Sequence, residues 1–321
     1  MTAPTTTPAA PAAQAAPAGQ AAPATPAAPA AQAAPAGQAA PAAPAVTAPA
    51  GPVSRTRLHV TDRDLAAYRA AARARLGAPA RAGAGPAHPF VAAHALAQHT
   101  VSALTAGDHG FTGVVHLAQE IRTHAPLTAG DVDVAVEVAA VRREARGTRL
   151  ALTTRLTDAA TGAPLADLAT AALLLGATGT EPYGALPPAA HPGSVPDGPP
   201  LVLTHVLDAG DTRAYAHASG DLNPIHLDDD AARAAGFPGV IAHGMHLVAL
   251  AAEEITDRHA GGDPARVTAL GARFAAPTRP GTELRLTLQP HDRGTVVRFT
   301  IATEAGTAVK AGWARIAPAG E

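Results

Sequence analysis

One order of elements occurs twice along the chain, and this internal repetition constrains the fold more strongly than any other feature of the sequence. Each copy combines one apolar helix with a series of long extended segments separated by Gly-centred turns. Helices are predicted over 90–104 and 245–255. Strands are predicted over 114–127, 132–141, 149–158, 165–175, 201–209, 266–278, 282–290, 295–303 and 307–316. Because one face of each sheet must be covered, we expect an α+β fold in which a sheet of about four strands wraps around each helix.

Composition sets the boundaries of the two copies. A Pro- and Gly-rich stretch over 182–200 is predicted to link an N-terminal unit, 53–181, to a C-terminal unit, 201–321. A local match supports the repetition, because HAPLTAGD (His124–Asp131) and FAAPTRPGT (Phe274–Thr282) both carry Ala-Pro followed by Gly at the same offset. The sequence therefore predicts two fused copies of one unit.

Residues 1–52 differ from both units, because they contain no charged and no aromatic side chain. The segment Thr7–Ala24 recurs unchanged as Thr25–Ala42. Frequent proline blocks helix and sheet ladders, and alanine buries too little surface to offset the loss of chain entropy. We therefore expect a disordered Pro-rich spacer. Because it has neither the basic region of a secretory signal nor an uninterrupted apolar span, we expect a cytoplasmic protein without a membrane anchor.

The composition excludes several classes of function. With 24 Lys+Arg against 26 Asp+Glu, the chain lacks the dense basic surface of a nucleic-acid-binding protein. It has no cysteine, which rules out disulfides, a Cys-based zinc site and a Cys nucleophile. We expect no metal and no nucleotide cofactor, because neither a His-Glu-x-x-His spacing nor a Gly-x-Gly-x-x-Gly loop occurs.

The segment ASGDLNPIH (Ala218–His226) carries the residues most suited to chemistry, and the first half has no counterpart of it. Gly220 and the Asn223-Pro224 pair break regular structure, so this is predicted to be a loop in which Asp221 and His226 converge. A carboxylate beside an imidazole is the minimal pair for general acid–base catalysis. Asn223 is expected to orient the aspartate or a water by hydrogen bonding.

A second motif, IAHGMHLVAL, places His243 and Gly244 where the apolar helix is predicted to begin. A glycine at that position lets a ligand approach the free N–H groups of the helix terminus, which is the geometry of an oxyanion hole. We expect His243, together with Ser219, to support the site rather than to act on the substrate.

These segments resemble a known family. SGDLNPIHLD followed by AAGFPGVIAHGM resembles the hydratase-2 motif of the MaoC-like dehydratases and R-specific enoyl-CoA hydratases. The organisation of 53–321 is similar to that of the double-hotdog members, with a degenerate first half and a catalytic second half. The resemblance implies Asp221 and His226 as the catalytic pair, Asn223 as their partner, and the backbone of Gly244 as an oxyanion-hole donor.

The function that the resemblance implies is reversible hydration of trans-2-enoyl thioesters to (R)-3-hydroxyacyl thioesters by syn addition of water, as in fatty acid metabolism. The thioester is carried by CoA or by acyl carrier protein, no cofactor is expected, and a homodimer is compatible with this function. An acyl-CoA thioesterase is an alternative, because one fold can serve several chemistries. A non-catalytic acyl-thioester-binding or partner subunit is another alternative.

Deleting residues 1–52 tests the spacer hypothesis. Because a spacer makes no packing contacts, the truncated protein should keep the melting temperature and the turnover of the full chain within experimental error. Differential scanning calorimetry and a steady-state assay on both proteins measure this. A loss of several degrees would show that the segment packs on the folded part.

Overall fold

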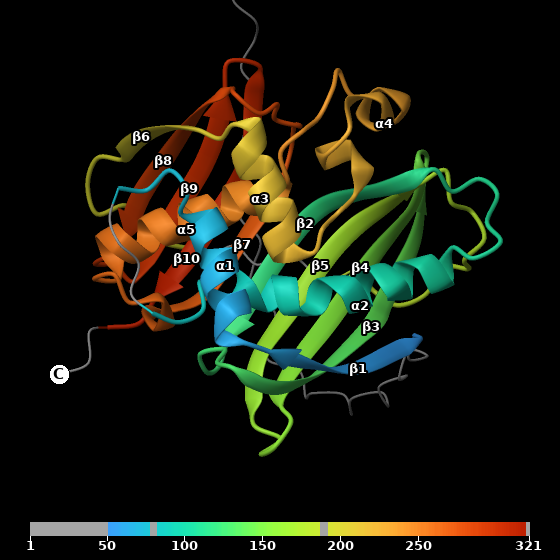
Figure 1. The fold of residues 1–321 in the computed structure, drawn as a ribbon, viewed down its shortest axis with the longest axis horizontal. Coiled ribbons are helices and arrows are strands. Elements are labelled where there is room, and N and C mark those ends of the chain that lie inside the picture. Colours follow the sequence, from blue (N-terminus) through green and yellow to red (C-terminus); the bar gives the residue numbers. More distant parts are fainter. Residues whose placement is uncertain (1–50, 78–81, 187–191, 319–321) are drawn as a thin grey trace, which may run out of the picture. The chain divides into compact units, whose positions relative to one another are not determined.

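The strands of both halves join in a single antiparallel sheet with the order β1-β3-β4-β5-β2-β7-β10-β9-β8-β6 (Figure 1). The computed structural model describes residues 51–77, 82–186 and 192–318, all of which belong to one unit that spans Thr47–Glu321. The predicted spacer, apart from residues 51 and 52, lies outside the described residues.

The elements occur in the same order in both halves. The strands are β1 (Val53–Val60), β2 (Gly113–Thr123), β3 (Gly130–Glu144), β4 (Gly147–Asp158), β5 (Pro164–Leu175), β6 (Leu201–Val206), β7 (Val267–Phe274), β8 (Glu283–His291), β9 (Val296–Thr303) and β10 (Gly306–Ile316). The helices are α1 (Asp62–Ala72), α2 (His88–Leu104), α3 (Ala209–Ser219), α4 (Asp229–Ala234) and α5 (Gly244–His259), with short 3-10 turns η1 (Pro224–His226) and η2 (Pro264–Arg266). Strand, outer helix, central helix and four further strands thus occur in this order twice, with α4 inserted between the outer and central helices of the second half.

The structure confirms both central helices and the long strands of each half, and it adds the unpredicted β1 to the first half, so that each half contains five strands. β1 was missed because it is an edge strand whose side chains are mostly exposed, so it lacks a clear apolar alternation. The helices α1 and α3 were missed because alanine supplies much of their apolar surface. The predicted strand 201–209 was too long: β6 ends at Val206, and Asp208 caps α3.

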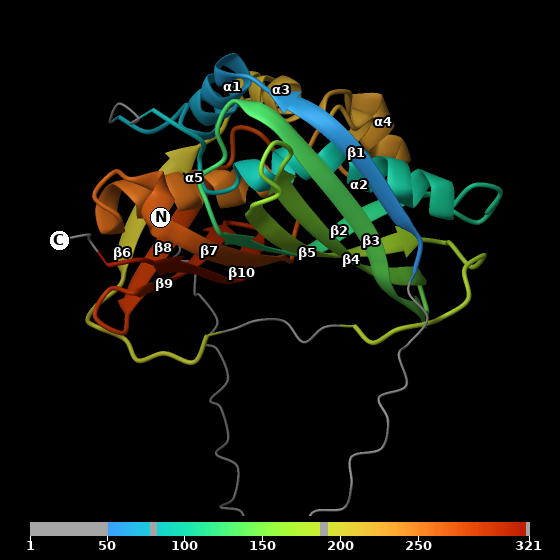
Figure 2. The ribbon, with the colours of Figure 1, turned by 90° about the horizontal axis from the view of Figure 1, so that it is seen from below.

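The two central helices lie on the same face of the sheet, and the outer helices form a further layer over them (Figure 2). Alternate residues of β3, such as Val134, Val136 and Val138, point into the core and are almost fully buried. α5 is buried over most of its length, from Met245 to Thr256. Among the described residues, no helix combines the length and hydrophobicity needed to cross a membrane.

The seam between the halves is the pairing of β2 with β7, in which Ala118–Arg122 run antiparallel to Ala269–Arg273. The turns that follow β2 and β7 are the two segments that share the Ala-Pro-x-x-x-Gly pattern, so they occupy equivalent positions in the fold. The seam makes the sheet continuous between the halves.

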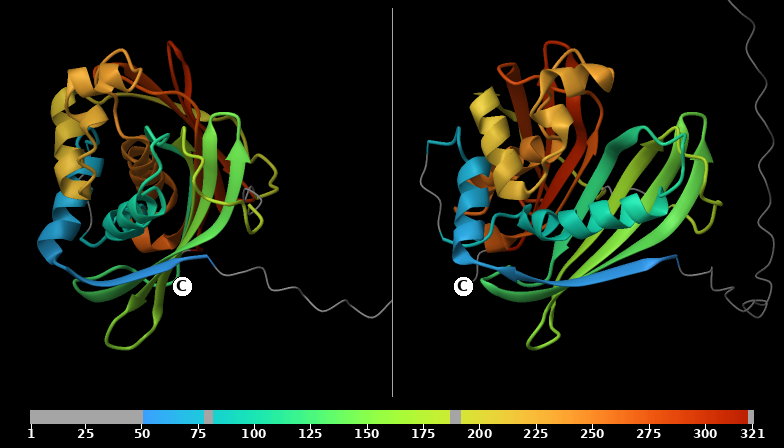
Figure 3. Two further views of the ribbon diagram at one scale, coloured as in Figure 1. Left: turned by 90° about the vertical axis from the view of Figure 1, so that its right-hand side faces the viewer. Right: turned by 45° about the vertical axis from the view of Figure 1, so that its right-hand side comes forward.

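The outer helices make contacts between the two halves, because α1 of the first half packs against α3 and α5 of the second (Figure 3). Both helices begin with a capping box, Thr61 with Asp64 and Asp208 with Asp211. A buried ion-pair network ties α1 to α5. Glu253 on α5 accepts from Arg69 at 3.1 Å and from Arg73 at 2.7 Å, and Arg73 also reaches Asp257 at 2.8 Å.

Replacing Glu253 tests how much this network contributes. Glu253→Gln removes the carboxylate that faces two buried guanidinium groups, so the free energy of unfolding should fall by about 3 kcal/mol. Urea denaturation measures it, with the exposed Glu304→Gln as the matched control. Equal stability of the two variants would show that the buried pair contributes nothing to the fold.

Candidate active site

The loop between α3 and α5 holds three of the predicted site residues, Asp221, Asn223 and His226. α3 ends at Ser219, and the following Gly220, with a φ of 71°, turns the chain out of the helix in a conformation that other residues rarely adopt. Asp221 follows directly, and the 3-10 turn η1 ends with His226. The turn brings the carboxylate and the imidazole to the wall of one cavity.

Backbone amides hold this loop in place. The amide of Asp221 donates to Oγ of Ser219 at 3.3 Å, and the amide of Asn223 donates to Oδ1 of Asp221 at 3.3 Å. The side chain of Asn223, expected to orient the aspartate or a water, instead accepts from the amide of Ile225 at 3.3 Å and caps η1. Asn223 therefore contacts the carboxylate through its main chain.

His226 is fixed by one ring nitrogen and leaves the other available. Its Nδ1 lies 2.8 Å from the carbonyl oxygen of Ile241, which can only accept, so Nδ1 carries the proton. In the neutral ring Nε2 is then a proton acceptor, and among the described residues it has no hydrogen-bond partner. His226 is thus oriented as a base toward the cavity.

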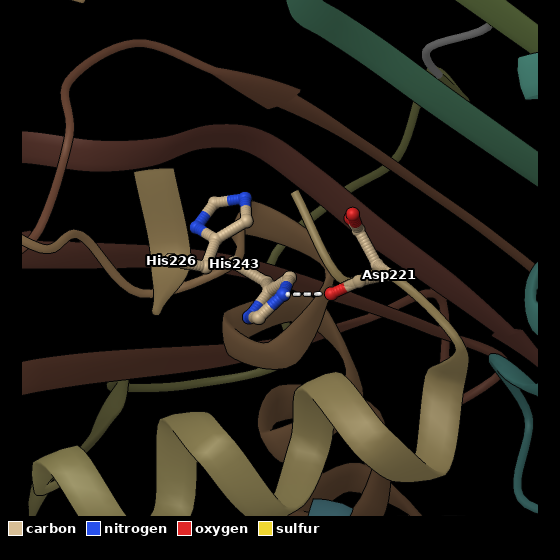
Figure 4. Close-up of side chains that lie close together, drawn as sticks. All are labelled: Asp221, His226 and His243. Carbon is tan, nitrogen blue, oxygen red and sulfur yellow. Dashed lines mark hydrogen bonds between the residues drawn. The ribbon is translucent and has the colours of Figure 1, made fainter. Parts of the chain in front are cut away.

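His243 supports both members of the pair from below (Figure 4). It is the residue before α5, and its Nε2 donates to the carbonyl oxygen of Asp221 at 3.0 Å. Its ring stacks on that of His226, with centroids 3.7 Å apart. Tyr215 of α3 packs against His243 in turn, with centroids 5.1 Å apart.

Gly244 is the first residue of α5, so its N–H has no acceptor within the helix. The ring of Phe274 lies against it so closely that a Cβ atom on residue 244 would come within 2.7 Å of the ring. A side chain at residue 244 would therefore force the ring of Phe274 to shift. Glycine also leaves the helix terminus open toward the cavity that Gly244 lines.

The cavity has a volume of about 480 Å³ and is built from both halves of the chain. The second half contributes Asp221, His226, His243 and Gly244. The first half contributes mainly apolar side chains from α2, the following turn and the sheet, among them Phe90, Val101, Phe111, Leu152 and Leu168. The cavity therefore combines groups that suit proton transfer with apolar side chains that suit an apolar group.

Two histidines of the first half, which the sequence analysis did not assign to the site, also line the cavity. His94 on α2 places Nε2 3.6 Å from Oδ1 of Asp221. His116 on β2 stacks on Phe90 with centroids 5.6 Å apart and lies 4.6 Å from the ring of Phe274. The spacing of Phe90 and His94 by four residues places both on one face of the helix, and this was the available signal.

Three residues of the site, Asp221, His226 and His243, each offer one potential metal-ligand atom. These three atoms all lie within 4.8 Å of one another. A carboxylate and two imidazoles can in principle bind a divalent metal. Hydrogen bonds to main-chain carbonyl oxygens occupy one nitrogen of each ring, so each histidine has one remaining nitrogen for any such ligand. The same arrangement suits proton transfer between the carboxylate, a water and the free nitrogen of His226.

Comparisons with known proteins identify the family of the chain. Residues 189–312 match the family described as the MaoC like domain. The chain is also 31% identical over 200 residues to the 3-hydroxyacyl-thioester dehydratase Y of Mycobacterium tuberculosis, a match that covers 61% of this chain and 68% of the relative. The chain belongs to the MaoC-like dehydratase family.

Solved structures place this MaoC-like protein among double hotdog folds. The MaoC-like dehydratase from Phytophthora capsici is 22% identical and superimposes with a TM-score of 0.69, covering 83% of this chain and 95% of the other. A conserved protein of Mycobacterium tuberculosis described as a double hotdog fold is 15% identical, with a TM-score of 0.55 over 83% of this chain and 94% of the other. The predicted fold class is thus confirmed.

Burial and neighbouring charges set the protonation of this MaoC-like site. Desolvation lowers the pKa of His226, although the hydrogen bond to Ile241 and the charge of Asp221 oppose it. For Asp221 burial acts to raise the pKa. The facing ring of His94, together with the nearby rings of His243 and His226, outweighs burial and holds the pKa of Asp221 below its usual value. Near neutral pH the pair is therefore an ionised carboxylate and a neutral imidazole.

Several histidines around the site are buried in the neutral form, which predicts how stability depends on pH. Burial lowers the pKa of His246 to about 4 and that of His243 to about 3. The unfolded chain takes up protons near pH 6.5 but the folded chain does not. Stability should therefore be full above pH 6.5 and fall as the pH drops toward 4, by roughly 3 kcal/mol for a residue such as His246.

Urea denaturation at pH 7.5, 6.5, 5.5 and 4.5 measures this dependence. His246→Phe keeps the stacking on Tyr215 and should reduce the slope, whereas the exposed His99→Gln should not change it. A free energy of unfolding that stays constant between pH 7 and 5 would contradict the burial of neutral histidines.

Proposed function

We propose that the chain catalyses the interconversion of trans-2-enoyl thioesters and (R)-3-hydroxyacyl thioesters. The observation that carries this proposal is the convergence of the Asp221 carboxylate, the free Nε2 of His226 and the N-terminus of α5 on one cavity with an apolar first-half wall. The name of the mycobacterial relative, a 3-hydroxyacyl-thioester dehydratase, supports the same reaction.

The protonation states assign the roles of the pair. An ionised Asp221 and a neutral His226 protonated on Nδ1 both accept hydrogen bonds, so together they can hold one water by its two protons. One O–H bond of this water breaks as its oxygen bonds to C3, and the pair takes the proton. The pair then delivers that proton to C2. Since hydroxyl and proton come from the same side of the alkene, the addition is syn.

The thioester oxygen needs stabilisation, because negative charge develops there when C3 is attacked. The N–H of Gly244 at the start of α5 is the donor placed for this, and the helix dipole adds to its effect. The apolar first-half wall receives the acyl chain. The carrier, CoA or acyl carrier protein, remains outside the cavity in this arrangement.

The cytoplasmic location and the homodimer remain predictions from the sequence. Cell fractionation tests the first, and size-exclusion chromatography with light scattering tests the second. The catalytic proposal depends on neither of them, because the described cavity draws its residues from a single chain.

Substitution of the acid–base pair tests the proposal. General acid–base groups contribute roughly 10²- to 10⁴-fold, so Asp221→Asn and His226→Gln should each lower kcat for crotonyl-, octenoyl- or dodecenoyl-CoA hydration by at least ~100-fold. The double variant should be little slower than either single one, because the two residues act as a unit. Loss of absorbance of the conjugated thioester follows the reaction.

Matched controls are available on the same elements. Asp230→Asn on α4 and His217→Gln on α3 change exposed residues and should leave kcat unchanged. Chelators should have no effect. Release of free thiol without hydration would indicate a thioesterase. If both site variants are folded and keep near-native rates, the loop is not part of the active site.

A further inference from the structure

His94 reaches the catalytic aspartate from the half of the chain that lacks the acid–base loop. It lies on α2, where its ring packs against Phe90 with centroids 5.4 Å apart. Its Nε2 is buried, is 3.6 Å from Oδ1 of Asp221, and has no hydrogen-bond partner among the described residues. A buried polar nitrogen is seldom left without a partner, and the aspartate is the group it faces.

The two oxygens of the Asp221 carboxylate are in different situations. Oδ1 accepts from the amide of Asn223 at 3.3 Å and faces His94, so one oxygen lies between the two halves of the chain. Oδ2 has no hydrogen-bond partner among the described residues. A carboxylate rotates about its terminal bond unless its oxygens are held, so anchoring Oδ1 determines where Oδ2 points.

We propose that His94 is a positioning residue for the reaction, which holds Oδ1 of Asp221 so that Oδ2 meets the water shared with His226. The inference rests on the proposed hydration of enoyl thioesters. Hydrogen bonds of catalytic groups are often long in an unliganded site and shorten when substrate binds, which fits the distance of 3.6 Å. His94 thereby makes the active site depend on both halves.

The other groups around Asp221 act differently from His94. His243 at the start of α5 donates to the main-chain carbonyl of Asp221 and not to its carboxylate. His226 of η1 uses its Nδ1 for Ile241, and His116 of β2 faces the carbonyl oxygen of Ala118 at 3.2 Å. Tyr215 of α3 packs against His243 with the two rings tilted and stacks on His246. His94 is thus the side chain placed to hold the carboxylate.

The first test compares three variants in the hydratase assay on the full chain. A catalytic group displaced by ~1 Å can cost ~100-fold in rate. His94→Leu should therefore lower kcat by roughly 10- to 100-fold while KM stays within about threefold. His94→Gln places an amide N–H near the position of Nε2 and should recover much of kcat. His99→Leu, an exposed residue on the same helix, should behave as wild type.

The second test is a double-mutant cycle with Asp221→Asn. If His94 acts through the aspartate, His94→Leu should cost less than about twofold in the Asp221→Asn background, although it costs much more in wild type. A purely structural role of His94 would instead lower the rate by the same factor in both backgrounds. Circular dichroism and melting curves verify that each variant is folded, and His94→Ala takes the place of His94→Leu if that variant does not fold.

The outcomes separate the inference from the function on which it rests. A wild-type chain that hydrates no enoyl thioester overturns both. An active wild type whose folded His94→Leu variant keeps kcat within twofold overturns the role of His94 alone. So do additive losses in the cycle, or a His94→Gln variant as impaired as His94→Leu. Recovery by Gln together with strong coupling to Asp221 supports the inference.

Discussion

The antiparallel pairing of β2 with β7 is the interaction on which the rest of the structure depends. Each half alone would end in an edge strand with unpaired N–H and C=O groups, and the seam satisfies both edges at once. It also places α2 and α5 on the same face of one sheet, so the space between them becomes a cavity with walls from both halves. The ion pairs between α1 of the first half and α5 of the second link the outer helix layer across the same boundary between the halves.

The candidate site combines a rigid helix terminus with a loop fixed by main-chain hydrogen bonds. His243 links the two, because it precedes α5, donates to Asp221 and stacks on His226. The loop therefore needs no regular structure to hold its geometry. Burial keeps the imidazoles neutral while the surrounding histidines keep Asp221 ionised, so one environment sets opposite protonation for the two partners.

Sequence reasoning succeeded where a local pattern carries the information. The central helices and the long strands follow from hydrophobic periodicity. Loop chemistry within a few residues singled out Asp221, Asn223 and His226, which the structure places on one cavity, and their catalytic roles stay predictions. It failed for α1 and α3, whose alanine-rich faces give little apolar contrast. It also missed His94, because no local pattern indicates that a helix residue of one half will contact a loop that lies more than a hundred residues later in the chain. That contact depends on the seam.

The connections between outer and central helices are unequal, residues 73–87 in the first half and 220–243 in the second. This inequality has an evolutionary consequence. In an assembly of two identical subunits, every mutation would alter both copies of the site together. Joining the copies in one chain lets selection change each connection separately. The first copy can then diverge in residues that line the cavity without altering the loop that carries Asp221 and His226 in the second.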